Sequence, residues 1–150
     1  MQAIRLFIIM ILLSITVSAQ GITIPQEVKD SFTQLYPKAT GVKWIKVDET
    51  EVYDAEYQAK FKNKGNLITV VFNTSGEFVM TKTNINKSKL PKPILTYIKD
   101  NYGGIKVVEA NQLEAKSKNK FYEAIVKIGA EKLSLYFNEE GEQTDKGNIE

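Results

Sequence analysis

Apolar residues recur along the chain either every second residue or every three to four residues. The spacing of three to four residues predicts two short helices. Pro25 and Pro91 stand just before the helical stretches, at a position where a helix tolerates the missing N–H of proline. Pro37 follows the first stretch and Gly103-Gly104 follows the second, and both end a helix. The apolar stripes are Val28, Phe32, Leu35 and Tyr36 in the first helix, and Ile94, Leu95, Ile98 and Tyr102 in the second.

Alternation of apolar and polar residues predicts strands with one buried face and one wet face. It is clearest at residues 53–61 and returns at residues 122–128. Residues 42–47 and 105–109 are rich in β-branched side chains and predict a strand before each alternating segment. Third strands are expected at 66–72 and 132–137, and fourth strands at 77–83 and near Gln143. The side chains expected to point inward are Tyr53, Ala55, Tyr57, Ala59, Phe61, Ile68, Val70, Phe72, Tyr122, Ala124, Val126, Ile128, Leu133, Leu135 and Phe137.

The same order of elements occurs twice in the chain. Residues 72–77, Phe-Asn-Thr-Ser-Gly-Glu, return as residues 137–142, Phe-Asn-Glu-Glu-Gly-Glu. Tyr57-Gln58-Ala59 returns at the same offset as Tyr122-Glu123-Ala124. The prolines and apolar residues of the first helix return in the second one position further on. Three landmarks in the same order indicate two copies of one supersecondary unit.

Each copy therefore reads α-β-β-β-β, which predicts an α+β fold. One helix on a four-stranded sheet makes a two-layer unit, and a unit of about 65 residues is marginal alone. We expect the two units to join edge to edge into one antiparallel sheet with both helices on one face. The expected organisation is a signal peptide at 1–19, repeat 1 at 20–85, repeat 2 at 86–146 and a flexible tail at 147–150.

The first residues have the three parts of a secretory signal peptide. Arg5 is the only positively charged side chain before Lys29, an apolar run follows at residues 6–17, and Val17-Ser18-Ala19 is a small-residue cleavage site. The run is shorter than the roughly 20 apolar residues of a spanning helix. We predict cleavage near Ala19-Gln20, a periplasmic or secreted location and no stable membrane insertion afterwards. A retained membrane anchor is the alternative.

Charge and residue usage narrow the class of partner. The chain has 20 Lys and Arg against 18 Asp and Glu, and its net charge is +2. Proteins that read nucleic acids depend on basic stripes and on Arg contacts to bases, but Arg5 is the only arginine and lies in the predicted signal peptide. The lysine clusters at 60–64 and 116–120 are interpreted as solvated hairpin tips. We expect no nucleic-acid partner.

Metal and nucleophile chemistry lack their usual residues. The sequence contains no Cys and no His, which removes the common ligands of zinc, copper and haem and the Ser–His and Cys–His pairs of nucleophilic catalysis. The acidic residues at 48–51 and 139–142 lack the pattern of an EF-hand loop. No Gly-rich phosphate loop links a strand to a helix. The sequence therefore predicts no enzyme, no catalytic residue, no cofactor and no metal.

The sheet face away from the helices carries the candidate contact residues. By alternation, Val71 and Tyr136 point outward at equivalent positions of the third strands, and Phe121 points outward on a neighbouring strand. Folding at the turn sets Tyr136 opposite Glu123 and diagonal to Phe121. Trp44 is a further candidate, and its facing is ambiguous. A few aromatic anchors carry most of the energy of an interface, although single exposed apolar residues are also ordinary on surfaces.

These motifs resemble those of the putative beta-lactamase-inhibitor-like, PepSY-like family of secreted proteins from Bacteroidetes. The resemblance covers Ile24 to Asp145 and rests on Trp44, on both copies of Tyr-x-Ala, and on residues 72–77 and 137–142. It implies a tandem fold like the beta-lactamase inhibitor protein, in which a concave sheet grips a partner enzyme, and an exported location. It also implies a link to peptidase inhibition. The disulfides of the beta-lactamase inhibitor protein cannot form in a chain without cysteine.

The leading hypothesis is an exported, non-enzymatic module that binds an unknown envelope or secreted protein through its open sheet, with a peptidase as one candidate. The predicted partner-binding residues are Trp44, Val71, Phe121 and Tyr136. One alternative is a small-ligand sensor or carrier with a pocket between sheet and helices, lined by Tyr57, Ala59, Tyr122 and Ala124. Another is a structural envelope protein that associates with itself through its edge strands.

Overall fold

The computed structural model describes residues 22–48, 56–145 and 148–149. The predicted signal peptide and two residues of the predicted inner face, Tyr53 and Ala55, lie outside the described residues. Among the residues that are described, no helix is long and apolar enough to cross a membrane.

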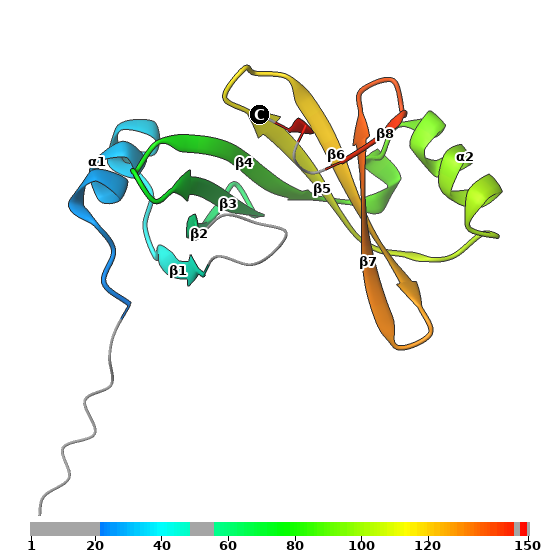
Figure 1. Cartoon of the computed structure of the whole chain (residues 1–150), viewed down its shortest axis with the longest axis horizontal. Coiled ribbons are helices and arrows are strands. Elements are labelled where there is room, and N and C mark those ends of the chain that lie inside the picture. Colours follow the sequence, from blue (N-terminus) through cyan, green and yellow to red (C-terminus); the bar gives the residue numbers. More distant parts are fainter. Residues whose placement is uncertain (1–21, 49–55, 146–147, 150) are drawn as a thin grey trace, which may run out of the picture.

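Within the described residues, two helices and eight strands form in the predicted order (Figure 1). All strand pairs are antiparallel, and the strands follow one another across a single sheet in chain order. A 3₁₀ turn, η1, occupies the connector between the two copies. The elements are α1 (Gln26–Leu35), β1 (Lys43–Val47), β2 (Glu56–Asn63), β3 (Asn66–Asn73), β4 (Phe78–Ile85), η1 (Lys87–Lys89), α2 (Lys92–Asn101), β5 (Val107–Ala115), β6 (Lys120–Ile128), β7 (Glu131–Asn138) and β8 (Gln143–Thr144).

The two copies meet where β4 pairs with β5, from Met80 opposite Ala115 to Ile85 opposite Ala110. The alternating side chains of β4 show that both helices lie on one face. Thr81 meets the Tyr36 hydroxyl at the end of α1, with 3.2 Å between the oxygens. Ile85, four residues further on and therefore on the same face of the strand, packs into the core beneath α2. The predicted edge-to-edge two-layer α+β fold is confirmed.

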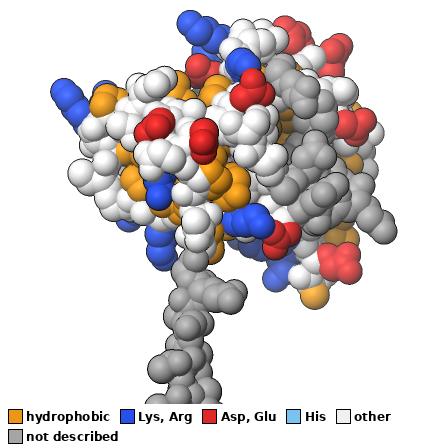
Figure 2. All heavy atoms as spheres, turned by 60° about the vertical axis from the view of Figure 1, so that its left-hand side comes forward, with side chains coloured by type: hydrophobic (Ala, Val, Ile, Leu, Met, Phe, Trp, Pro, Cys, Tyr) orange, Lys and Arg blue, Asp and Glu red, His pale blue; other side chains and the backbone are white. Residues whose placement is uncertain are grey.

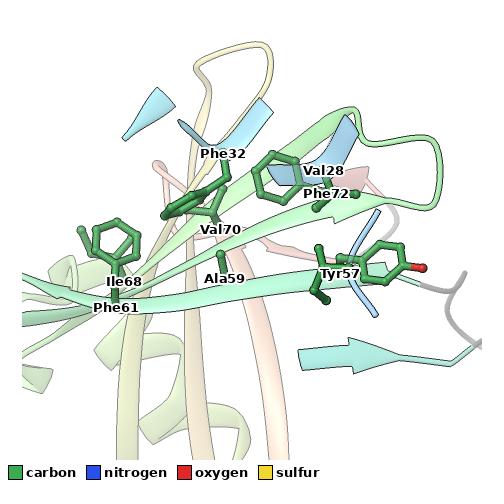
Figure 3. Packing of buried hydrophobic residues seen from close by; sticks show 9 residues of the cluster. Val28, Phe32, Tyr57, Ala59, Phe61, Ile68, Val70 and Phe72 are labelled. Atoms are coloured by element: carbon green, nitrogen blue, oxygen red, sulfur yellow. The ribbon is translucent and has the colours of Figure 1, made fainter. Parts of the chain in front are cut away.

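The first core fills the space between α1 and the sheet (Figure 3). Phe32 from the helix meets Phe61 from β2 edge-on, with ring centroids 5.5 Å apart. Val70 and Phe72 of β3 point to the same side, as their alternation predicts. The buried members of this core are Ile24, Val28, Phe32, Tyr57, Ala59, Phe61, Ile68, Val70 and Phe72.

The second core repeats this arrangement under α2. Phe137 takes the place of Phe72, and both side chains are fully buried, so their inward assignment is correct. The buried members are Leu90, Ile94, Ile98, Ala110, Ala124, Val126, Leu135 and Phe137. Small alanines on β5 and β6 leave room for the helix.

Two inward predictions in the second copy are wrong. Ile128 is 46% exposed and Leu133 is 40% exposed. Both lie near the tip of the β6–β7 hairpin, which extends away from α2 in Figure 1. Alternation assigns each side chain to a face, but the helix is too short to cover the whole length of that face.

The repeated Asn-x-x-Gly-Glu segment forms a tight turn against the start of each helix. The Asn73 side-chain oxygen accepts hydrogen bonds from the backbone N–H groups of Ser75 and Glu77. Gly76 and Gly141 have φ values of 83° and 88°, which only glycine adopts readily. A Cβ on Gly141 would lie 2.5 Å from the Cβ of Pro93 in the first turn of α2. The glycines therefore serve the contact with the helix as well as the turn.

Candidate functional site: the open face of the sheet

The sheet face opposite the helices, here called the open face, contains a hollow of about 180 Å³. Strands of both copies contribute to it, because the hollow extends across the β4–β5 junction. Its lining combines charged, amide and apolar side chains: Glu56, Gln58, Lys60, Leu67, Thr69, Val71, Met80, Lys82, Asn84, Glu109, Asn111, Leu113, Glu123 and Tyr136.

The strand register explains how these residues meet. Asn84, Asn111, Glu123 and Tyr136 are successive cross-strand partners on β4, β5, β6 and β7. They form a row across the sheet, and together with Lys82 we call them the polar zone. Cross-strand partners have Cβ atoms about 5 Å apart, so side chains in such a row can interact directly.

Hydrogen bonds connect the polar zone. The amide nitrogen of Asn111 donates to Glu123 Oε2 at 2.8 Å, and the Tyr136 hydroxyl donates to Glu123 Oε1 at 3.2 Å. Asn84 donates to the side-chain oxygen of Asn111 at 3.3 Å. Lys82 Nζ reaches over β5 to Glu123 Oε2 at 2.5 Å. Among the described residues, no buried side-chain polar atom is left without a hydrogen-bond partner.

Glu123 is ionised although only 3% of the residue is exposed. Burial by itself raises its pKa, because a charge is poorly solvated there. The charge of Lys82 and hydrogen bonds from Lys82, Asn111 and Ser134 act in the opposite direction, and the net result is a lowered pKa. The Lys82 side chain remains 31% exposed. The polar zone therefore presents one accessible cation above a buried carboxylate.

An apolar cluster adjoins the polar zone, and we call it the apolar zone. It consists of Val71, Met80, Leu113, Ala115 and Ile149, all buried. Val71 pairs with Met80, and Met80 pairs with Ala115, so the zone extends over β3, β4 and β5. Val79, Phe121 and Tyr136 pack against it while partly exposed. An open sheet face with such a cluster is more apolar than an ordinary solvated face.

The structure brings together three of the four predicted contact residues. Val71, Phe121 and Tyr136 meet at the apolar zone, and Tyr136 lies opposite Glu123 as expected. Val71 lies on the open face as predicted, but its side chain is buried there. It belongs to the same buried cluster as Met80 and Ile149.

Trp44 lies on the other side of the sheet. Its ring meets Phe32 of α1 edge-on, with centroids 5.3 Å apart, and it packs against the first core. Trp44 therefore does not share a face with Val71 and Tyr136. Lys82, Asn111 and Ile149 are members of the site that sequence reasoning missed. No local sequence pattern predicts the register between β4 and β5, and therefore none indicates that Lys82 and Glu123 are partners.

Of the predicted flexible tail at 147–150 the structure describes residues 148 and 149 only, and Ile149 is 0% exposed in the apolar zone. The backbone N–H of Asn148 donates to the carbonyl of Asp145 at 3.1 Å, and its side chain donates to the Thr144 hydroxyl at 3.3 Å.

Two other kinds of site, a metal site and a ligand pocket between the sheet and the helices, can be compared with the described part of the chain. No group of three or more acidic residues there could hold a metal ion. Tyr57, Ala59, Tyr122 and Ala124, the proposed lining of a ligand pocket, pack into the two helix-side cores. Lysine and acidic side chains lie interspersed on the face shown in Figure 2.

Solved structures from Bacteroides share the fold. A DUF2874 family protein from Bacteroides ovatus is 25% identical with a TM-score of 0.65, and the match covers 83% of this chain and 87% of that one. A BLIP-like protein from Bacteroides fragilis is 27% identical with a TM-score of 0.60, covering 84% and 86%. A protein from Bacteroides eggerthii, described as a putative periplasmic protein, is 19% identical with a TM-score of 0.65, covering 82% and 87%.

Sequence comparison assigns the family. No curated protein matches the chain. The model of the family described as "Putative beta-lactamase-inhibitor-like, PepSY-like" matches residues 15–69 and again residues 55–144, which together span most of the chain and both of its copies. This protein therefore belongs to the putative beta-lactamase-inhibitor-like, PepSY-like family.

Proposed function

We propose that this protein is an exported, non-enzymatic module that binds another protein through the open face and inhibits it. An envelope or secreted enzyme, such as a peptidase, is the proposed partner. The observation that carries the proposal is the open face itself, where a buried apolar zone adjoins a hydrogen-bonded polar zone with one accessible cation. Interfaces combine an apolar centre with polar groups around it in the same way.

The size of the hollow supports a protein partner over a free small molecule. Pockets for small ligands usually measure about 300–1,000 Å³, whereas this hollow measures about 180 Å³. A hollow of that size suits a single side chain inserted from a partner's loop. Phe121 and Tyr136, partly exposed beside it, can serve as aromatic anchors for the rest of the contact.

Family and relatives support the same proposal. The family description names inhibitor-like proteins, and a relative of this fold is described as BLIP-like. The proposed location rests on the predicted signal peptide and on the B. eggerthii relative described as periplasmic. Self-association through the sheet edge is disfavoured, because Lys43 and Lys46 place exposed charges on the short edge strand β1.

Crosslinking capture in the native envelope tests the proposal. Three chains are compared: wild type, Phe121→Ser/Tyr136→Ser on the open face, and Leu35→Ser/Leu95→Ser on exposed positions of the helices. We expect one envelope protein to be captured by the wild type and the helix variant and lost from the open-face variant. If that protein is an enzyme, equimolar wild-type chain should lower its activity. Identical capture profiles for all three folded chains would remove the open face from the function.

A further inference from the structure

Ile149 occupies the surface on which the proposed function places the partner. It is the only member of the apolar zone that does not come from a strand; the other four lie on β3, β4 and β5. The contact residues Phe121 and Tyr136 pack against the same cluster. One aliphatic side chain of this protein thus covers part of its own candidate docking face.

The described residues next to Ile149 are held by local hydrogen bonds and not by strand pairing. Asn148 makes its two hydrogen bonds to Asp145 and Thr144 on the exposed side. The preceding strand β8 has two residues only. Neither described residue of this segment, Asn148 or Ile149, belongs to the two helix-side cores. Release of Ile149 would therefore remove no side chain from either helix-side core.

We infer that Ile149 is a removable plug of the docking face, which a partner replaces with a branched aliphatic side chain of its own. This inference rests on the proposed function for the identity of the occupant as a protein. Val71, Met80 and Leu113 form the seat. Their apolar character excludes a charged side chain at this position, because a charge in such a seat has no buried counterion within the apolar zone. Lys82 and Tyr136 beside the seat can accept the polar flank of the same partner segment.

A plug lowers the apparent affinity of the face by the fraction of molecules in which the seat is open. Burial of one aliphatic side chain favours the closed state by a factor of about 10 to 100. The tethered segment acts at a high effective concentration, so a contact that is weak between separate molecules still keeps the seat closed. Removal of the Ile149 side chain should therefore raise affinity for an aliphatic segment by about 10-fold or more.

Met80 provides a reporter inside the seat. It is the only methionine beyond residue 10 and is buried in the apolar zone. Its methyl resonance, assigned with a Met80→Leu variant, is measured in full-length wild type, Ile149→Ser, Ile149→Val and Ile22→Ser. Ile22 is 53% exposed and supplies the matched control. We expect the resonance to move in Ile149→Ser only, while all four chains melt cooperatively.

The second measurement adds a peptide with the sequence of residues 143–150. We expect millimolar peptide to return the Met80 resonance of Ile149→Ser toward its wild-type position and to leave wild type unchanged. The same peptide carrying serine in place of isoleucine should have no effect. An unmoved resonance in Ile149→Ser, loss of its cooperative melting, or equal peptide binding to wild type would each overturn the plug. These experiments need no natural partner, so failure of envelope capture and failure of the plug are distinguished.

Discussion

Glu123 retains its negative charge in a nearly buried position because Lys82 and the hydrogen-bond donors Asn111, Ser134 and Tyr136 surround it. A buried ion pair often contributes little net stability compared with an apolar pair of the same shape. Removal of either side chain of the pair, however, leaves the other charge without its counterion. The polar zone therefore makes the stability of this protein depend on pH through one identifiable residue.

The substitution Glu123→Gln tests that dependence. The pKa of Glu123 in the folded chain lies below its ordinary value of 4.5, so the charged group stabilises the fold above that pH. This stabilisation is lost as the pH falls through the lowered pKa. We expect Glu123→Gln to lose about 1–3 kcal/mol near neutral pH, and the difference from wild type to shrink below pH 4.5. Urea unfolding at several pH values measures it; a difference that stays constant into strong acid would contradict the assignment.

At the level of elements, the repeated hairpin turn connects the sheet to the helix of its own copy. Gly76 lies against Glu27 in the first turn of α1, and Gly141 lies against Pro93 and Ile94 in the first turn of α2. The repeated sequence motif predicts a turn, but it does not predict that the turn lies against the helix. The contact fixes where each helix begins relative to the sheet.

Gly141→Ala and Gly65→Ala separate the two roles of glycine. Both residues have positive φ, at 88° and 84°, but a Cβ at Gly65 would meet no atom within 4 Å. We expect Gly65→Ala to cost about 1 kcal/mol from backbone strain. Gly141→Ala should cost a further 1–3 kcal/mol, approximately, because its Cβ displaces the start of α2. Denaturant midpoints measure both. Equal losses of unfolding free energy in the two variants would show that the contact with the helix does not contribute to stability.

At the scale of the whole molecule, the open face joins the two copies. Lys82 belongs to the first copy and Glu123 to the second, and they form an ion pair across β5. The apolar zone likewise combines Val71 and Met80 with Leu113 and Ala115. The copies therefore share a continuous sheet, an ion pair and an apolar cluster, and we expect them to unfold together.

Phe137→Ala tests this coupling, with Trp44 as the reporter. Phe137 lies in the second core, whereas Trp44, the only tryptophan, packs against the first. Loss of a buried Phe side chain typically costs about 3–5 kcal/mol. The Trp44 fluorescence transition should move to lower denaturant together with the far-UV circular dichroism. Leu133→Ala, at an exposed position, is the control. A Trp44 midpoint that stays at the wild-type value would show that the copies unfold independently.

The amino-acid sequence by itself determined the elements, their order and the face to which most strand residues point. The helix stripes, the alternation at Tyr57 to Phe61 and the repeated turns are local patterns, and local sterics and hydrogen bonding suffice to predict their structure. The opposition of Tyr136 and Glu123 followed as well, because a hairpin turn sets its own register.

Only the tertiary structure decided which distant residues share a site. The register of β4 on β5 depends on a connection that passes through a helix, so no turn in the sequence fixes it, and the pair of Lys82 and Glu123 follows from that register. The length of the helices decided that Leu133 is exposed, and packing against Phe32 decided the side of Trp44. The burial of Ile149 likewise depends on long-range apolar contacts, which have no period in the sequence.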